Sequence, residues 1–475
     1  MQSQANRIRR NTVFSFFSQL IRILTNFLLF LGIARLYGVT VFGQFTTAHT
    51  LSTICVLIGD FGFDTLLTTH IGRTKENIGS VVSSLFSMKF VFASLATIGM
   101  FCVGLIHSFS PGTRILIFIF SFYVLFSVVL NFFFALFKGH EELEHEAIIS
   151  LIMNCILLAL LIVFGIFHIP IYSVAILFVG SRITGILLSY RVVRARMPLA
   201  DIKFSLRDGK RYLKNISIFG IHFVFGNLYF MLDTILIAVL LGDREVGTYQ
   251  AVIKIVALVL IMPDIAINTL LPVLSRLHFE NREQWVHLSA LLNKALFYII
   301  LPISLTLGIF ADQIITILYG AGSFGTAAII LRIFSIVLFV RFSVETYALV
   351  LTTSQRQEIR MAIVVAATIV NLGLNSILIP RNGIVGAAIA SLITNCLVGC
   401  AYVMSSRIVL QRWFIDGKQF IALAGMTLAA GGLWSIRTVP LWLPVSVMLA
   451  LYGCIIYFLF FTREDREWIF VRGWK

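Results

Sequence analysis

The chain has 475 residues, of which 59% are hydrophobic and only 12% are charged, and its formal net charge is +15. Water-soluble globular domains carry about 25% charged residues, so this composition excludes that class and predicts an all-α polytopic membrane protein. The basic excess does not indicate nucleic-acid binding, because no aromatic-interleaved basic domain lies outside the apolar stretches.

Apolar windows of about 20 residues, the length that crosses the hydrocarbon core of a bilayer, follow one another along the chain. About 14 are expected, at 11–36, 43–68, 79–106, 114–137, 147–167, 170–192, 213–241, 248–274, 286–310, 326–352, 359–379, 383–406, 419–436 and 441–461. The last two are short and are interrupted by Pro440 and Pro444. The minimal expectation is therefore a core of 12 spans followed by a terminal hairpin.

Lys and Arg are distributed unequally between the two sides that this arrangement defines. With a cytoplasmic N-terminus, 25 of the 37 Lys and Arg residues lie in inside segments and five lie in outside segments. The remaining seven lie within spans. The positive-inside rule therefore predicts that both termini face the cytoplasm.

An internal repeat indicates that a membrane-embedded unit has been duplicated. Gly38, Gly43, Asp60, Thr65, Leu66 and Leu67 recur 204 residues later as Gly242, Gly247, Asp264, Thr269, Leu270 and Leu271. Duplicated bundles that hold a substrate near the bilayer midplane are common among secondary transporters. We expect an N-lobe at 1–195, a basic cytoplasmic linker at 196–212, a C-lobe at 213–407, and a last hairpin with a cytoplasmic tail at 408–475.

The first span carries a polar face in an otherwise apolar helix. Gln19, Arg22 and Asn26 follow at intervals of three and four residues, so their side chains share one face. An arginine at the centre of a membrane costs about 2.5–3.5 kcal/mol on insertion scales, which favours a charged partner or a wet cavity. We expect these three residues to line a substrate cavity, with an internal salt bridge as the alternative for Arg22.

Other cations within the spans divide into cavity candidates and structural residues. Arg182, Lys254 and Arg332 are candidates for the same cavity, although Lys254 could equally extend toward the membrane surface. Lys89 and Lys294 lie two to three turns from basic inside ends, so their long side chains are expected to snorkel to the interface.

Acidic residues within the spans are candidates for gating or for ion coupling. The repeat aligns Asp60 with Asp264, and a structural role such as capping a broken helix competes with binding of Na⁺ or H⁺. Arg341 and Glu345 lie one turn apart and are expected to pair.

Two further polar residues, His222 and Asp233, share a face of the seventh span. They are candidates for the substrate cavity. A hydrogen-bonded packing role is the alternative for the histidine.

The sequence contains no catalytic constellation. It has no glycine-rich phosphate loop, no His-Glu-x-x-His motif and no nucleophile elbow. We therefore expect a protein that is not an enzyme, with no catalytic residues, no metal site and no cofactor. Any energy coupling is expected to use a Na⁺ or H⁺ gradient or the substrate gradient.

Four short segments carry a family resemblance: Leu-Tyr-Gly-Val-Thr-Val-Phe-Gly-Gln-Phe at 36–45, Gly-Asp-Phe-Gly at 59–62, Asn-Leu-Gly-Leu-Asn at 371–375, and Gly-Ile-Val-Gly-Ala-Ala at 383–388. In these segments the chain resembles the polysaccharide exporters of the multidrug/oligosaccharidyl-lipid/polysaccharide (MOP) flippase superfamily. It most resembles the flippases of O-antigen, a part of lipopolysaccharide, and of exopolysaccharide repeat units.

The resemblance implies a two-lobed bundle that moves undecaprenyl-pyrophosphate-linked oligosaccharide across the bacterial inner membrane by alternating access. In such flippases a basic residue on the first span and another on the eighth hold the pyrophosphate, which implies those roles for Arg22 and Lys254. The drug exporters of the superfamily use acidic cavities for cations, and the excess of Arg and Lys here argues against that branch.

Two alternatives remain from the sequence. One is a small-molecule drug or cation antiporter with the same fold, and the other is a polytopic glycan polymerase. A polymerase needs a sizeable outer loop, whereas the longest outside loop here, at 311–326, has Asp312 as its only charge. Expected partners are the lipid-linked glycan, membrane lipids, and glycan polymerase or export machinery.

Overall fold

The computed structural model describes residues 2–73, 78–106, 108–196, 204, 220, 224, 228, 231–320, 322, 324–410, 414, 417–434, 446 and 452. Within these ranges, the side chains of residues 2–22, 73, 78, 196, 429–430 and 432–434 are not described.

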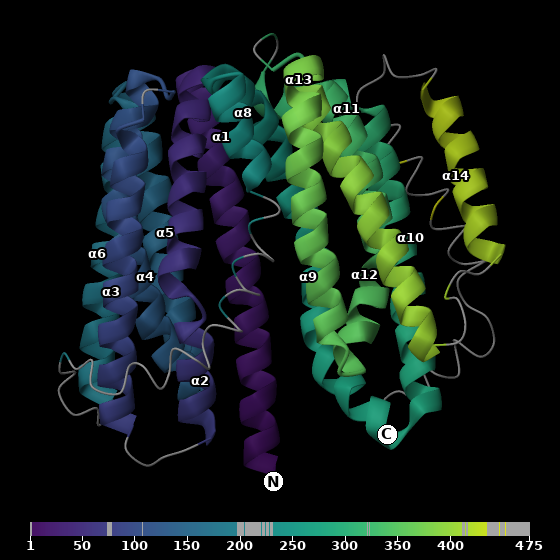
Figure 1. Cartoon of the computed structure of the whole chain (residues 1–475), viewed down its shortest axis with the longest axis horizontal. Coiled ribbons are helices and arrows are strands. Elements are labelled where there is room, and N and C mark those ends of the chain that lie inside the picture. Colours follow the sequence, from purple (N-terminus) through teal and green to yellow (C-terminus); the bar gives the residue numbers. More distant parts are fainter. Residues whose placement is uncertain are drawn as a thin grey trace. The chain divides into compact units, whose positions relative to one another are not determined.

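All regular secondary structure in the described ranges is helical (Figure 1). The helices are α1 Gln2–Asp60, α2 Phe63–Arg73, α3 Ile78–Gly104, α4 Pro111–Gly139, α5 Leu143–Ile166, α6 Ile171–Arg196, α8 Leu232–Leu240, α9 Asp243–Glu280, α10 Arg282–Ile309, α11 Ala311–Tyr319, α12 Ala327–Thr353, α13 Gln357–Leu410 and α14 Gly417–Trp434. The described part of the chain contains 9 helices that are long and apolar enough to cross a membrane. The prediction of an all-helical membrane protein is confirmed, whereas most of the predicted span at 213–241 and all but two residues of that at 441–461 lie outside the described residues.

Two of the long helices turn back at a glycine, which makes each of them a pair of spans. Gly38 in α1 has φ 80° and Gly383 in α13 has φ 62°, values that glycine adopts without steric penalty. The rings of Phe30 and Phe45, which flank Gly38 in sequence, have centroids only 6.2 Å apart. The two arms of α1 therefore pack against each other as a helical hairpin, as the sequence predicted for the spans 11–36 and 43–68.

The second of these predicted spans is not one continuous helix. α1 ends at Asp60, Phe61 and Gly62 adopt φ values of 40° and 88°, and α2 begins at Phe63. The matching position in the second half of the chain differs, because α9 continues through Pro263 and Asp264 without a break. An acidic residue stands on each side of this break, Asp60 before it and Asp64 after it, so the broken helix considered for Asp60 in the sequence is present in the first half of the chain.

The segment predicted as the longest outside loop also contains regular structure. Residues of this segment form α11, and its Asp312 pairs with Arg332 of α12. Arg332 therefore has a carboxylate partner at the helix surface, with its side chain 35% exposed.

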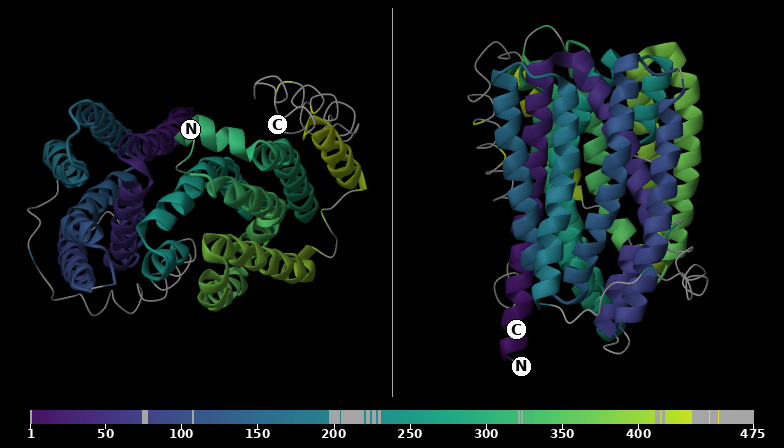
Figure 2. Two further views of the ribbon diagram at one scale, coloured as in Figure 1. Left: turned by 90° about the horizontal axis from the view of Figure 1, so that it is seen from above. Right: turned by 90° about the vertical axis from the view of Figure 1, so that its left-hand side faces the viewer.

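The chain divides into two compact units, Met1–Leu258 and Val259–Lys475, and the division falls within α9. In the first unit, buried side chains of α2 to α6 form a core that includes Leu67, Leu85 and Phe137. In the second unit, α14 packs on α10 through contacts among Phe297, Ala422 and their neighbours. Figure 2 shows the long helices of each unit running side by side.

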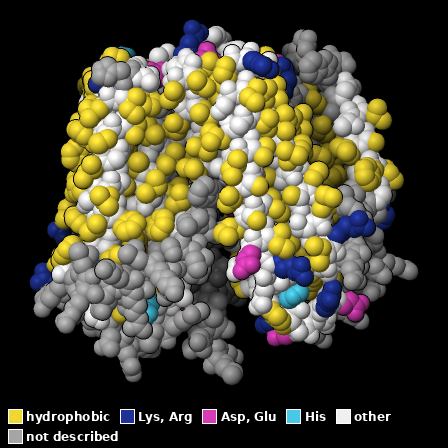
Figure 3. Space-filling model, in the orientation of Figure 1, with side chains coloured by type: hydrophobic (Ala, Val, Ile, Leu, Met, Phe, Trp, Pro, Cys, Tyr) yellow, Lys and Arg dark blue, Asp and Glu magenta, His cyan; other side chains and the backbone are white. Residues whose placement is uncertain are grey.

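Hydrophobic side chains cover most of the described surface along the lengths of the helices in Figure 3, while Lys and Arg gather toward the helix ends. Large exposed apolar side chains such as those of Ile166, Phe167 and Leu428 would be unfavourable in water. This surface is that of a protein whose solvent is lipid.

Candidate functional site

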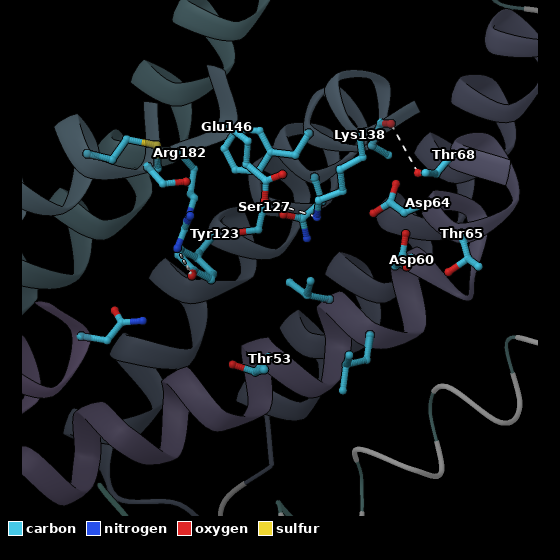
Figure 4. A pocket seen from close by; sticks show the side chains of 18 of the residues that line it. Thr53, Asp60, Asp64, Thr65, Thr68, Tyr123, Ser127, Lys138, Glu146 and Arg182 are labelled. Carbon is cyan, nitrogen blue, oxygen red and sulfur yellow. Dashed lines mark hydrogen bonds and ion pairs between the residues drawn. The ribbon is translucent and has the colours of Figure 1, made fainter. Parts of the chain in front are cut away.

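A pocket of about 640 Å³ lies inside the first unit, between α1, α2, α4, α5 and α6 (Figure 4). Most of its polar lining consists of hydroxyl and amide groups: Asn26 and Thr53 from α1, Thr65, Thr68 and Thr69 from α2, Ser127 and Asn131 from α4, and Ser150 and Asn154 from α5. Polar groups inside membrane helices are expensive unless they face water or a ligand. Their concentration on one cavity fits a ligand with many hydroxyl groups.

Arg182 of α6 supplies the cationic end of this pocket. Its Nη2 donates a hydrogen bond of 2.7 Å to Oη of Tyr123, and its Cζ lies 4.9 Å from the centroid of the same ring. Its Nε is buried without a hydrogen-bond partner, and no described carboxylate forms an ion pair with it. An arginine that keeps a free N–H in a polar cavity can bind an anion such as phosphate.

Lys254 of α9 is separated from Arg182 by an aromatic cluster, which consists of the rings of Phe30, His49 and Tyr123. Its Nζ is 3.7 Å from the centroid of Phe30, a cation–π contact. The ring of His49 lies 5.2 Å from that of Phe30 and 5.9 Å from that of Tyr123. The two cations are therefore connected through rings and not through a carboxylate, so neither positive charge is neutralised by the cluster.

Asp60, Asp64 and Lys89 form a largely buried ionic cluster at the opposite end of the pocket from Arg182. Nζ of Lys89 lies 2.7 Å from Oδ1 of Asp60 and also pairs with Asp64. Lys89 is 1% exposed, so the expectation that it snorkels to the interface is wrong. Two carboxylates at the break between α1 and α2 hold the ammonium group inside the protein.

A second ion pair lines the same pocket. Nζ of Lys138 on α4 lies 3.2 Å from Oε1 of Glu146 on α5, and the lysine side chain is 47% exposed. Figure 4 shows Arg182 and Tyr123 together at one side of the pocket and Asp60, Asp64 and Thr65 at the other.

Other candidate residues lie elsewhere in the two units. Asp233 of α8 is buried and accepts a hydrogen bond of 2.8 Å from Oη of Tyr249, so it binds a neighbouring helix and does not line the pocket. In the second unit, Nε of Arg341 lies 3.9 Å from Oε2 of Glu345, the pairing that their spacing indicated. Asp264 is within electrostatic range of both.

Three candidates have side chains outside the described residues. Gln19 and Arg22 belong to α1, one to two turns before the pocket residue Asn26, and His222 lies in the predicted seventh span. Their roles stay predictions.

Sequence reasoning missed several residues that the fold brings to the pocket. Tyr123 lies in a segment rich in phenylalanine, so its hydroxyl group did not stand out in the sequence. Asn131 and Asn154 are single amides in apolar spans. Intramembrane amides were a usable signal, because each must find a polar neighbour. Nothing in the sequence indicated which helices would meet.

Comparison with known proteins assigns the chain to a family. The sequence profile described as "Polysaccharide biosynthesis protein" matches residues 8–278, more than half of the chain and all of the pocket. The chain belongs to this polysaccharide biosynthesis protein family. The recognition made from the glycine and asparagine segments is thereby confirmed at the level of family and superfamily.

A curated relative of this polysaccharide biosynthesis protein is the "Probable low-salt glycan biosynthesis flippase Agl15" of Haloferax volcanii. It is 27% identical over 216 residues, which cover 43% of this chain and 44% of the relative. The alignment thus spans less than half of the relative.

Solved structures with the same fold come from the MOP superfamily. The Lipid II flippase MurJ in an inward closed conformation has a TM-score of 0.72 and 15% identity, covering 94% of this chain and 98% of MurJ. An inward-facing multidrug resistance MATE family transporter has a TM-score of 0.69 and 12% identity, covering 82% of this chain and 94% of its own. This polysaccharide biosynthesis protein therefore has the fold of a MOP transporter and is a multi-pass membrane protein.

Proposed function

We propose that this protein flips a lipid-linked oligosaccharide, namely an undecaprenyl-pyrophosphate-linked O-antigen or exopolysaccharide repeat unit, across the bacterial inner membrane. Both termini face the cytoplasm, and the N-lobe at 1–195 and the C-lobe at 213–407 alternate the access of a cationic cavity. The family match and the relative with a flippase name support transport of a glycan in general.

The observation that carries this proposal is the guanidinium of Arg182, which forms no ion pair with a described carboxylate, in a pocket lined by hydroxyl and amide groups. A diphosphate needs cationic N–H donors, and sugar hydroxyls need hydrogen-bonding groups of both kinds. A pocket of about 640 Å³ provides both inside a membrane unit. The acidic residues that line the pocket, Asp60, Asp64 and Glu146, already have lysine partners.

The physical mechanism follows from the cost of moving a charged sugar through hydrocarbon. The pocket replaces the hydration shell of the head group, while the polyprenyl tail stays in the lipid. Movement of the two lobes about the bound head group then exposes it to the other side, provided that the two conformations bind it differently.

Arg22 and Lys254 extend the cationic surface in this proposal. Arg22 precedes the pocket residue Asn26 by one turn of α1, and Lys254 lies beyond the aromatic cluster from Arg182. We expect Arg22→Ala to abolish flipping while leaving membrane insertion intact.

The test is a deletion strain complemented with wild type, Arg182→Gln or Arg191→Gln, in which inner-leaflet lipid-linked oligosaccharide and surface glycan are both measured. Removing charged hydrogen bonds costs about 1.5–3 kcal/mol, so Arg182→Gln should reduce flipping about ten- to hundredfold and cause inner-leaflet accumulation. Arg191 lies on the same helix but outside the pocket, and its variant should behave as wild type. Normal surface glycan with Arg182→Gln would contradict the assignment.

The same experiment separates the rival functions. Translocated but unpolymerised units after deletion would identify a glycan polymerase, whereas no change in either pool would favour a small-molecule antiporter, whose fold the MATE transporter shares. Glycan polymerase or export machinery is the expected downstream partner, and Na⁺ or H⁺ is the expected coupling ion.

A further inference from the structure

In the cluster of Asp60, Asp64 and Lys89, two carboxyl groups contact one ammonium group, and binding of a glycan head group does not account for this excess of acidic groups. Asp60 is the last residue of α1, Asp64 lies in the first turn of α2, and Lys89 reaches them from α3. Asp60 is 6% exposed and Lys89 is 1% exposed, while the side chain of Asp64, which lines the pocket, is 24% exposed. The break at Phe61 and Gly62 brings the two carboxyl groups to the same ammonium group, that of Lys89.

The charges in this cluster do not balance if all three groups are ionised. One ammonium group faces two carboxylates, and Oδ1 of Asp60 is buried without a hydrogen bond although Lys89 is near it. Neighbouring carboxylates in a largely buried site repel each other, so a single counter-ion does not favour the charged form of both. The cluster therefore needs one more positive charge.

The other charged groups around the pocket are occupied or distant. Lys138 of α4 pairs with Glu146 of α5, and Arg182 of α6 binds Tyr123 at the opposite end. His70 of α2 is half-buried, and no ion pair joins it to either aspartate. No described side chain besides Lys89 supplies the missing charge.

We propose that Asp60 and Asp64 share one exchangeable proton next to Lys89, and that the cluster is a proton-binding site of the first unit. A proton fits better than Na⁺, because the ammonium group already occupies the position between the carboxylates where a metal ion would sit. Hard cations also need several further oxygen ligands. Among the described residues, no group of three or more His, Cys, Asp or Glu side chains could hold a metal.

The proton controls the charge of the pocket. With it bound, the cluster is neutral and Arg182 is the uncompensated charge among the pocket residues; without it, the cluster's negative charge offsets that of Arg182. Proton binding and binding of an anionic ligand must then favour each other by the same factor. This consequence rests on the proposed function, whereas the proton site itself does not.

The internal repeat provides a natural comparison. α10 begins 204 residues after α3, so the positions that correspond to Asp60, Asp64 and Lys89 are Asp264, Asn268 and Asn293. At these three positions the second half keeps one carboxylate and has two asparagines, and its nearest lysine, Lys294, is one residue beyond Asn293 on the helix. The proton site belongs to the first half alone.

Infrared difference spectroscopy of the purified full-length protein tests the site without any transport assay. A pH step should show the carbonyl stretch of one buried protonated carboxyl group, absent in Asp60→Asn and in Asp64→Asn and unchanged in Asp264→Asn. An unchanged band in both cluster variants, or its loss in Asp264→Asn, would overturn the proposal. A band that responds to replacing Na⁺ with a large organic cation would also overturn it, in favour of a metal ion.

A labelling experiment on the wild-type protein covers the case in which the variants do not fold. A hydrophobic carbodiimide adds to a protonated carboxyl group to form an O-acylisourea, and the modified residue is found by mass spectrometry. We expect modification of Asp60 or Asp64 that falls as the pH rises; no modification at either, at any pH, refutes the site. Flipping that proceeds normally in that case would leave the proposed function intact, while a confirmed proton site without flipping would refute only the function.

Discussion

Lys89 links two helices, because it pairs with one carboxylate before and one after the short interruption between α1 and α2. Its own helix, α3, contributes no counter-charge in this contact, so the ammonium group depends on Asp60 of α1 and Asp64 of α2. A buried ion pair that loses one partner leaves an uncompensated charge. The lysine therefore has a larger effect on stability than its surface counterparts.

We expect Lys89→Met to reduce the free energy of unfolding by about 3–5 kcal/mol, because the cluster then contains buried carboxylates without a cation. Lys138→Met is the matched control, since that lysine is half-exposed and a surface pair contributes about 0–1 kcal/mol. Thermal unfolding of the purified proteins measures both. Equal effects of the two substitutions would show that the cluster does not stabilise the fold.

At the scale of elements, the start of the second arm of α1 and the start of α9 approach each other at two glycines of the internal repeat. A Cβ on Gly43 would lie 1.7 Å from the carbonyl oxygen of Asp243, and a Cβ on Gly247 would lie 2.0 Å from that of Val39. The repeat thus places a glycine on each side of the same contact. This reciprocity is what a twofold relation between duplicated elements produces.

The side chain of Asp243 strengthens the same contact. It accepts hydrogen bonds from Oγ1 of Thr113 at 2.7 Å and from Nε2 of Gln44 at 3.2 Å, and also one from Ser110, the N-cap of α4. A carboxylate near the N-termini of two helices is favoured by both helix dipoles. α1, α4 and α9 are therefore fixed to one another at this end.

Gly43→Ala should destabilise the protein by about 1–3 kcal/mol, because the added methyl group overlaps backbone atoms that cannot move independently. Gly99→Ala in α3 is the control: nothing lies within 4 Å of its Cβ position, and alanine is the better helix former by about 1 kcal/mol. The free energies of unfolding of both variants check this. A neutral Gly43→Ala would mean that α1 and α9 are not in contact in the protein.

At the scale of the whole molecule, the distribution of basic residues predicts the orientation of every loop. We expect fluorescent-protein fusions after His140 and after Ser354 to fluoresce, because these loops are cytoplasmic. Alkaline phosphatase fusions after His168 and after Leu241 should be active, because those loops lie outside. The reverse pattern would contradict both the orientation and the cytoplasmic termini.

The sequence by itself determined the properties that depend on composition and local order. These are the membrane environment, the helical class, the hairpins at Gly38 and Gly383, the repeat and the family. Each follows from hydropathy, backbone freedom or spacing, which neighbouring residues set without reference to the rest of the chain.

Only the tertiary structure decided which polar side chains meet. Lys89 looked like a residue that reaches the interface, yet it lies between two carboxylates. Arg182 looked like one of several cations, yet it lines the polar pocket and keeps an N–H without a hydrogen-bond partner. Arg332, which looked similar, pairs with Asp312. In a membrane, a charge is placed by the partners that other helices bring to it, and those contacts join residues that are far apart in the sequence.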